Sequence, residues 1–151
     1  MKTETKEFKL LKKIKDKDFD VDSLHQYNLQ ILTGSRDLQV TVIDSLTNKC
    51  LLLEDFALSR VQTYKELTSI LEDIFDSHHL LKAGFWKSVK VGFKNNKFAL
   101  VPSKLFDESS LFDYLKLNCK VNKETDQLLY YKHLKSDAVN CFAVNKQLYN
   151  W

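Results

Sequence analysis

Residues 27–43, YNLQILTGSRDLQVTVI, decide the fold of this chain. Apolar side chains alternate with polar ones in both halves of the stretch: Tyr27, Leu29 and Ile31, then Leu38, Val40 and Val42. Because successive side chains of a strand point to opposite faces, each half predicts a strand with one buried and one solvated face. The connection Thr33-Gly34-Ser35-Arg36 predicts a hairpin that aligns Ile31 with Leu38.

A strand and a helix are expected after this hairpin. Cys50–Phe56 reads as a third strand and completes an antiparallel meander. Thr63 and Glu66 then have the spacing of a capping box, with Thr63 as the N-cap. An apolar stripe at helical spacing follows and ends near Ser77.

Two further hairpins are expected, separated by a short helix over residues 108–117. The first pairs 88–94 with 97–101 across Asn95-Asn96, a dipeptide suited to the positive φ of a two-residue turn. This pairing places one set of side chains on the buried face: Val89, Val91, Phe93, Phe98 and Leu100. The second hairpin pairs 128–134 with 138–144, and Asn145 then caps a helix over 146–151.

The resulting order is an antiparallel three-stranded meander, helix, β-hairpin, helix and a further β-hairpin. It predicts an α+β fold with α/β-like character and resembles the beginning of a ribonuclease H-like or actin-like half-domain. We therefore expect a charged N-terminal arm over residues 1–20, frayed or loosely docked, and a half-domain over 21–118. Residues 119–151 are expected to start a second, related half or to form a C-terminal hairpin extension. Because the chain stops on Trp151 within an expected helix, we expect either a missing continuation or a docked C-terminal anchor.

Composition excludes several classes of protein. Only three glycines and one proline occur in 151 residues, which excludes collagen-like and Pro-rich chains and the glycine-rich phosphate loops. The net charge is +3, and among 23 basic residues only Arg36 and Arg60 are arginine, the side chain best suited to reading bases and phosphates.

Cysteine usage and hydropathy favour a cytoplasmic protein. Cys50, Cys119 and Cys141 are odd in number and far apart, so we expect reduced core thiols. The N-terminus lacks the apolar region of a secretory signal, and the aliphatic run Leu51-Leu52-Leu53 is far too short to span a membrane. We expect no membrane partner.

The turn Thr33-Gly34-Ser35-Arg36 is the candidate cofactor-binding segment. In actin-like ATPases and sugar kinases the corresponding hairpin tip carries Asp-x-Gly-Thr/Ser, whose amides cradle phosphate. Here Leu32 stands where the aspartate would be, and a leucine cannot hold Mg²⁺ or its waters. The segment is therefore either an ordinary glycine turn or a degenerate phosphate turn, and we expect no bound cofactor.

Other catalytic arrangements find little support. A ribonuclease H-type nuclease needs a carboxylate in the first strand, and 27–32 contains none. His78-His79 lack the spacing of a zinc helix motif and suit a polar helix end, although Asp44, Asp76 and Glu54-Asp55 could be imagined beside them. We expect no catalytic residue and no metal site; this favours a non-enzyme and leaves the question of an enzyme open.

A lysine-rich segment is the candidate nucleic-acid surface. Residues 77–106 contain six lysines and no acid, and Trp86, Lys90, Lys94 and Lys97 are its candidate contacts. The alternative is a solvated hairpin whose lysines blunt a sheet edge.

Several blocks resemble one family: residues 52–56 (LLEDF), 83–89 (AGFWKSV), 100–107 (LVPSKLFD), 114–115 with Asn118, and 138–144 (AVNCFAV). They are similar to an uncharacterised bacterial domain-of-unknown-function family whose structural representative has an actin-like ATPase fold. The resemblance spans Phe19 to Trp151. It implies one ribonuclease H-like half to about Asn118 plus the first hairpin of a second half, with no established activity to carry over.

Three functions follow as hypotheses. We favour a non-catalytic interaction or scaffold module, whose partner is another protein or a missing second half of the same chain. The first alternative is an ATP-binding or phosphoryl-transfer protein whose cleft is completed by that second half. The second alternative is a nucleic-acid binder that uses the lysine-rich segment over 82–104.

Overall fold

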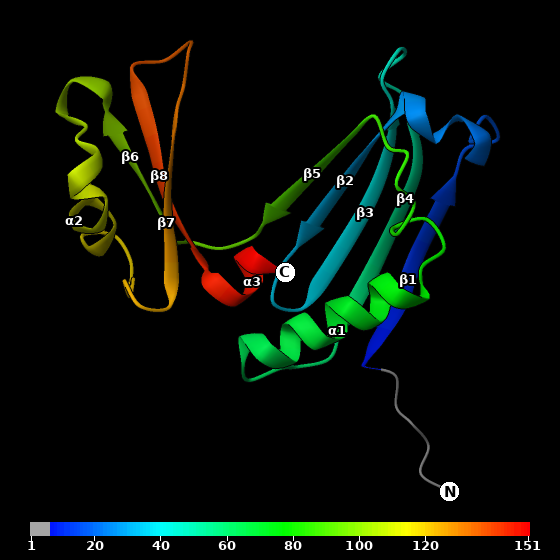
Figure 1. Cartoon of the computed structure of the whole chain (residues 1–151), viewed down its shortest axis with the longest axis horizontal. Helices are drawn as coiled ribbons and strands as arrows, with labels where there is room; N and C mark the ends of the chain where they lie inside the picture. The colour runs from blue at the N-terminus through cyan, green and yellow to red at the C-terminus, as the bar shows by residue number, and fades with distance from the viewer. Residues whose placement is uncertain (1–6) are drawn as a thin grey trace, which may run out of the picture. The chain divides into compact units, whose positions relative to one another are not determined.

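The computed structural model describes residues 7–151, so expectations for residues 1–6 lie outside it. The chain forms two compact units, the first ending at Lys94 and the second running from Asn95 to Trp151. Each unit has its own sheet and its own helices, which confirms the expected α+β class (Figure 1). Among the described residues, no helix is long and apolar enough to cross a membrane.

The first unit is built on a five-stranded sheet with the order β1-β4-β3-β2-β5. Its strands are β1 (Phe8–Lys15), β2 (Tyr27–Thr33), β3 (Asp37–Asp44), β4 (Cys50–Leu58) and β5 (Ser88–Phe93), with η1 (Val21–Gln26) before β2. Strands β2, β3 and β4 form the predicted antiparallel meander. Strand β5 joins β2 in parallel.

Helix α1 (Tyr64–Ser77) covers one face of this sheet (Figure 1). The predicted cap is confirmed, because Glu66 N donates to Thr63 Oγ1 at 3.2 Å. The Glu66 carboxylate turns back and accepts from Gln62 N at 2.7 Å. The apolar stripe of α1 then packs on the inward side chains of the meander: Leu67, Ile70, Leu71 and Ile74 on the helix, Leu29, Ile31, Leu38, Val40 and Val42 on the sheet.

The register of the β2–β3 hairpin differs from the expected one by two residues. Ile31 lies opposite Val40, and Thr33 lies opposite Leu38. Thr33 is buried and continues β2, so the pairing extends closer to the turn than apolar alternation alone predicted. A shift of two residues keeps every side chain on its predicted face.

The expected hairpin between residues 88–94 and 97–101 is wrong. Strand β5 pairs with β2, whereas β6 (Phe98–Pro102) pairs with β8 in the second unit. Among the described residues, Asn48 is the only non-glycine with positive φ, so Asn95-Asn96 do not form the two-residue hairpin turn. Asn95 instead donates its side-chain N–H to Ala143 O at 2.8 Å.

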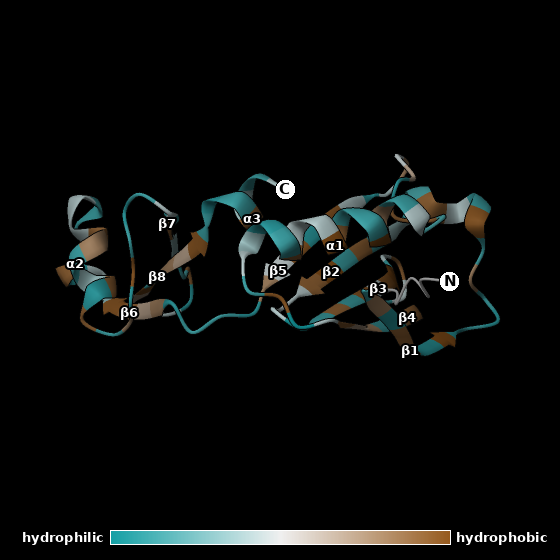
Figure 2. Ribbon diagram, turned by 90° about the horizontal axis from the view of Figure 1, so that it is seen from below, coloured by the Kyte–Doolittle hydropathy of each residue, from teal (hydrophilic) through white to brown (hydrophobic). Residues whose placement is uncertain are grey.

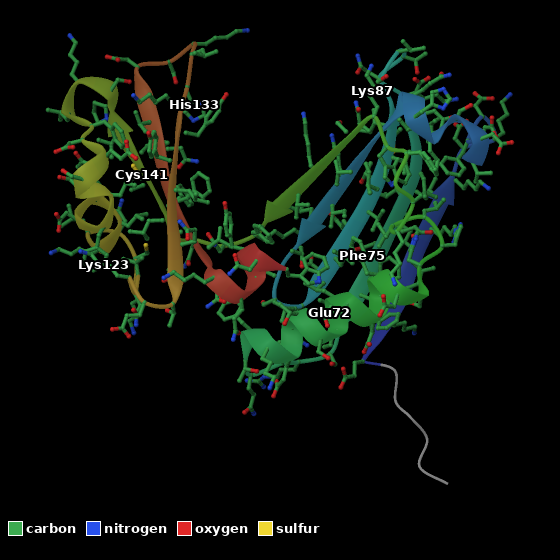
Figure 3. The ribbon with its side chains drawn as sticks, in the orientation of Figure 1. Glu72, Phe75, Lys87, Lys123, His133 and Cys141 are labelled. Atoms are coloured by element: carbon green, nitrogen blue, oxygen red, sulfur yellow. The ribbon has the colours of Figure 1, made fainter. Side chains whose placement is uncertain are left out.

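The second unit is a three-stranded antiparallel sheet with the order β6-β8-β7, one face of which packs on α2. The elements after β6 are η2 (Ser103–Leu105), η3 (Glu108–Ser110), α2 (Leu111–Lys116), β7 (Asp126–Lys132), β8 (Ala138–Asn145) and α3 (Lys146–Asn150). Its core contains Ala99, Val101, Leu115, Val139, Cys141 and Ala143; Cys141 lies on β8 (Figure 3). The short helix, the last hairpin and the Asn145 cap are confirmed, the cap by Gln147 N donating to Asn145 Oδ1 at 2.9 Å.

Two smaller expectations also need correction. The part of the arm that the structure describes is not frayed, because β1 pairs with β4 along residues 8–15. Hydrophilic and hydrophobic residues are interspersed along β1 (Figure 2), so its apolar alternation is poor. Pairing with β4, the Phe8–Phe56 ring contact and the Lys13–Glu54 ion pair hold it in place. Cys50 is exposed at the start of β4, whereas Cys141 is buried as expected, and burial raises the pKa of its thiol.

Candidate functional site

The candidate phosphate turn lies where β2 and β5 end. Gly34 N donates to Asp37 O at 2.9 Å and closes the hairpin. Lys94 N donates to Thr33 O at 2.8 Å, which fixes the end of β5 beside the turn. The structure thus places the turn at the carboxyl ends of two parallel strands, a common position for ligands in α/β sheets.

A carboxylate occupies the space above this turn. The Asp37 side chain lies against Gly34, and a Cβ built on Gly34 would be only 2.4 Å from Asp37 Oδ1. Asp37 also forms an ion pair with Lys94. The lysine charge next to the turn is therefore already matched by an acid, which weakens the attraction of the turn for an anion.

Ser35 lines a hollow between the turn and the start of α1, with Gln62, Thr63, Tyr64 and Leu67 among its neighbours. Helix N-termini attract anions because their first N–H groups lack helical partners. In α1 one of these N–H groups, that of Glu66, is taken by the Thr63 side chain, and the Glu66 carboxylate adds a negative charge nearby. Ser35, the exposed Arg36 and the backbone of the turn are groups here that could contact a phosphate.

Leu32, in place of the aspartate of the motif, lies on the sheet face opposite α1. Its Cδ1 would be 3.0 Å from a Cβ added to Gly92, the residue opposite it on β5. The missing side chain of Gly92 makes room for Leu32, and the pair forms an apolar contact where a metal-binding carboxylate would be needed.

The candidate nucleic-acid residues are not gathered on one hairpin face. Lys90 is exposed on β5, Lys94 pairs with Asp37, and Lys97 belongs to the second unit. Lys97 Nζ lies 3.0 Å from Asp126 Oδ2, a buried carboxylate. Trp86 is half-buried, and its Nε1 is shielded from water without a hydrogen-bond partner.

A buried polar cluster that sequence reasoning did not identify lies between β1, β4 and the end of α1. Glu54 is 2% exposed and accepts from Lys13 Nζ at 2.8 Å. His78 Nδ1 accepts from Leu80 N at 3.1 Å, so its Nε2 carries the proton that it donates to the other Glu54 oxygen. The sequence contains one signal of this cluster: Glu54 stands at a position of the β4 alternation that points inward.

The electrostatics of this cluster stabilise the ionised carboxylate. Burial by itself would raise the pKa of Glu54, but the hydrogen bonds from His78 and Lys13 outweigh it and hold that pKa at about 2. His79 stacks on the His78 ring with 5.3 Å between centroids. Within residues 7–151 no three His, Cys, Asp or Glu side chains are grouped so that they could hold a metal ion.

The second unit exposes an apolar sheet face on the side away from α2. We call it the open face; it consists of two rows across the three strands, Phe98-Phe142-Leu129 and Leu100-Asn140-Tyr131. Phe98 is 52%, Leu100 64% and Tyr131 57% exposed. Asn140 lies between Leu100 and Tyr131, and its Oδ1 is buried without a hydrogen-bond partner.

The structure reverses the orientation that the sequence predicted for the two faces of β6. Phe98 and Leu100 were expected to point inward, whereas Ala99 and Val101 do so. All four residues are apolar, so alternation could not identify the buried pair. The small Ala99 and Val101 lie on the side where α2 packs against the sheet.

Comparison with known families fits the architecture described above. The family model described as "Protein of unknown function (DUF3822)" matches residues 16–151. The chain belongs to this DUF3822 family. No curated protein matches this member of the family.

This DUF3822 chain is also similar to a solved structure, a Bacteroides thetaiotaomicron protein with an actin-like ATPase fold and unknown function. The TM-score is 0.73 at 20% sequence identity, over 87% of this chain and 49% of that one. The likeness shows the fold, and it confirms the actin-like fold that the resemblance implied. This DUF3822 chain spans about half the length of that protein.

Proposed function

We propose that this DUF3822 chain is a non-catalytic interaction module that binds a partner polypeptide through the open face of its second sheet. The observation that carries the proposal is the exposure of Phe98, Leu100 and Tyr131 on one face of the sheet. Sheets in folded domains are stabilised by covering their apolar faces, and a contiguous exposed apolar patch commonly marks a binding surface.

The orphaned oxygen of Asn140 supports the same function. A buried acceptor without a partner costs about 1–3 kcal/mol. Asn140 lies on β8, the middle strand of the open face, between Leu100 and Tyr131. Because this oxygen is closed off from water in the free chain, a partner N–H could donate to it only if binding turned the Asn140 side chain outward between Leu100 and Tyr131.

The polar clusters of the first unit support a non-catalytic reading. Catalytic groups need free, perturbed side chains that converge on an accessible point. Asp37 and Lys94 neutralise one another at the turn, and Glu54 is held by Lys13 and His78. These groups are used in structural ion pairs and hydrogen bonds.

The proposal is tested by site-specific photo-crosslinking in cells, with the crosslinker placed at Leu100 or, as a control, at Leu117 of the same unit, which is even more exposed. We expect a defined adduct from position 100 only. The crosslinked polypeptide, once identified and purified, should bind the purified chain, and Leu100→Ser should weaken this binding while Leu117→Ser does not. Equal adducts at both positions, or purified binding that Leu100→Ser leaves unchanged, would overturn the proposal.

A second candidate function is nucleotide binding at the turn. It is favoured by the hollow beside Ser35 at the carboxyl ends of β2 and β5. Calorimetry and thermal unfolding with Mg·ATP test it, using Ser35→Glu to repel phosphate and Ser69→Glu on the exposed side of α1 as the matched control. If Mg·ATP stabilises the wild type and Ser69→Glu but not Ser35→Glu, nucleotide binding at the turn replaces the proposal of a non-catalytic module.

Nucleic-acid binding through residues 82–104 stays a prediction without a favouring contact, because Lys94 and Lys97 are both in ion pairs. Binding of a generic oligonucleotide at low salt, weakened by added salt, is its test.

A further inference from the structure

The two edge strands of the first sheet differ in the way that their edges are protected. Strand β1 carries four lysines in eight residues, a common device against edge-to-edge pairing. Strand β5 (Ser88–Phe93) contains a single lysine and pairs with β2 alone. The β5 edge therefore presents outward-facing peptide groups without the lysine protection of β1.

The side chains of β5 define what this edge could accept. Val89 and Val91 are 52% and 46% exposed and share one face of the strand, the face on which Leu29 and Ile31 are buried. They extend the apolar surface of that face to the sheet edge. On the opposite face, Lys90 is exposed.

Charge along this edge is positive. Lys87 lies at the start of β5 (Figure 3); its Nζ donates to the Ser45 hydroxyl at 2.9 Å, and its charge also acts on the Asp44 carboxylate. Lys90 follows within the strand, and no acidic residue occurs between 77 and 106. Lys94, at the end of the strand, is paired with Asp37.

We propose that the β5 edge binds an extended acidic segment of a partner polypeptide as an additional strand. In β-augmentation, main-chain hydrogen bonds supply affinity and alternate side chains supply specificity. The segment would place apolar side chains beside Val89 and Val91 and carboxylates beside Lys90. This surface belongs to the first unit and is independent of the open face of the second.

A polypeptide is favoured over a nucleic acid by the form of the surface. A free strand edge offers alternating N–H and C=O groups, which another strand can pair with. Single-stranded nucleic acids instead require stacking platforms along a basic groove. Beside β5, Trp86 is half-buried and the exposed neighbours of Lys90 are valines.

The test mixes the full chain with a fluorescent, capped heptapeptide in which valine alternates with glutamate. Fluorescence anisotropy is the readout. We expect binding that weakens with salt, and a loss of about tenfold in Lys90→Glu. Lys9→Glu, on the opposite edge strand, is the matched control and should bind normally. Val91→Thr should weaken binding without a change in charge, and thermal unfolding checks that each variant is folded.

Three companion measurements can overturn the proposal. A peptide with proline at its centre, which cannot continue a ladder, should not bind, and equal binding would exclude strand addition. Amide NMR shifts should change at Ser88–Phe93; shifts confined to Phe98, Leu100 and Tyr131 would assign the peptide to the open face instead. Salt-sensitive binding of a single-stranded oligonucleotide, with no peptide binding, would make the edge a nucleic-acid surface. The crosslinking and binding test at Leu100 is a separate experiment, so failure here leaves the proposed function to its own test.

Discussion

At Glu54 a carboxylate is buried in a sheet and kept ionised by two neighbours. Lys13 reaches it from β1, and His78 reaches it from the end of α1. These three residues are distant in sequence, so their contact joins three elements of the first unit. Losing one partner of such a buried cluster is expected to cost more than losing an exposed ion pair.

The pKa of Glu54 predicts an acid-dependent loss of stability. Because the pKa of the folded state is about 2, below the ordinary value of 4.5, the ionised carboxylate stabilises the fold above pH 4.5. This contribution, at most about 3 kcal/mol, disappears as the pH falls through the folded pKa. Chemical denaturation across this range should show a steeper loss for the wild type than for Glu54→Gln. Parallel curves for the two proteins would contradict the assignment.

Gly34 provides a second prediction, because the Asp37 carboxylate occupies the space of its missing side chain. Gly34 does not have positive φ, so alanine fits the backbone there. Gly34→Ala should cost about 1 kcal/mol in the wild type, since the new methyl displaces Asp37 from Lys94. In an Asp37→Ala background the same change should stabilise by about 0.5 kcal/mol, by restricting the unfolded chain. The same sign in both backgrounds, measured by urea denaturation, would refute this reading.

At the scale of the element, β6 shows how a strand with two apolar faces is oriented. Phe98, Ala99, Leu100 and Val101 are all apolar, so the pattern itself does not distinguish the faces. The pairing with β8 and the packing of α2 select Ala99 and Val101 for the core. The larger side chains remain on the open face.

The orientation of β6 predicts opposite responses at neighbouring residues. Val101→Thr buries an unpaired hydroxyl and should lower the free energy of unfolding by about 2 kcal/mol. Leu100→Thr removes an exposed side chain and should change it by less than about 0.5 kcal/mol. Equilibrium denaturation of the two variants distinguishes this orientation from the reverse one, for which Leu100→Thr would be the more harmful change.

At the scale of the whole molecule, the chain consists of two units with separate cores. The first core is formed by α1 and its sheet, and the second by α2 and the sheet of β6, β7 and β8. Each unit carries one tryptophan, Trp86 in the first and Trp151 in the second. Local fluorescence can therefore follow each unit separately.

Separate cores predict separable unfolding. Leu29→Ala and Leu115→Ala each remove a fully buried side chain, one in each unit, and each should cost about 3 kcal/mol. A Trp151→Phe background isolates the Trp86 signal, and a Trp86→Phe background isolates the Trp151 signal. Leu29→Ala should lower the unfolding midpoint reported by Trp86 and leave the unfolding midpoint reported by Trp151 unchanged. Leu115→Ala should do the reverse. A common shift of both midpoints would show that the units unfold as one.

The sequence by itself determined the features that depend on neighbouring residues: the meander over β2, β3 and β4, the Thr63 cap, the stripe of α1, the last hairpin and the Asn145 cap. Alternation, capping and helical spacing are local, so these elements could be predicted one at a time. The absence of an aspartate at Leu32 was also visible in the sequence, and it bears directly on the candidate site.

Tertiary structure alone decided which distant segments meet. Strand β5 could pair with β6 by local pattern, but it lies beside β2, a segment about sixty residues earlier in the chain. Such long-range placement brings Lys13 and the His78 N–H to Glu54, joins Lys94 to Asp37 and leaves Phe98 and Leu100 exposed. An apolar alternation specifies that a strand has a buried face, but its partner is chosen by the packing energy of the assembled sheet.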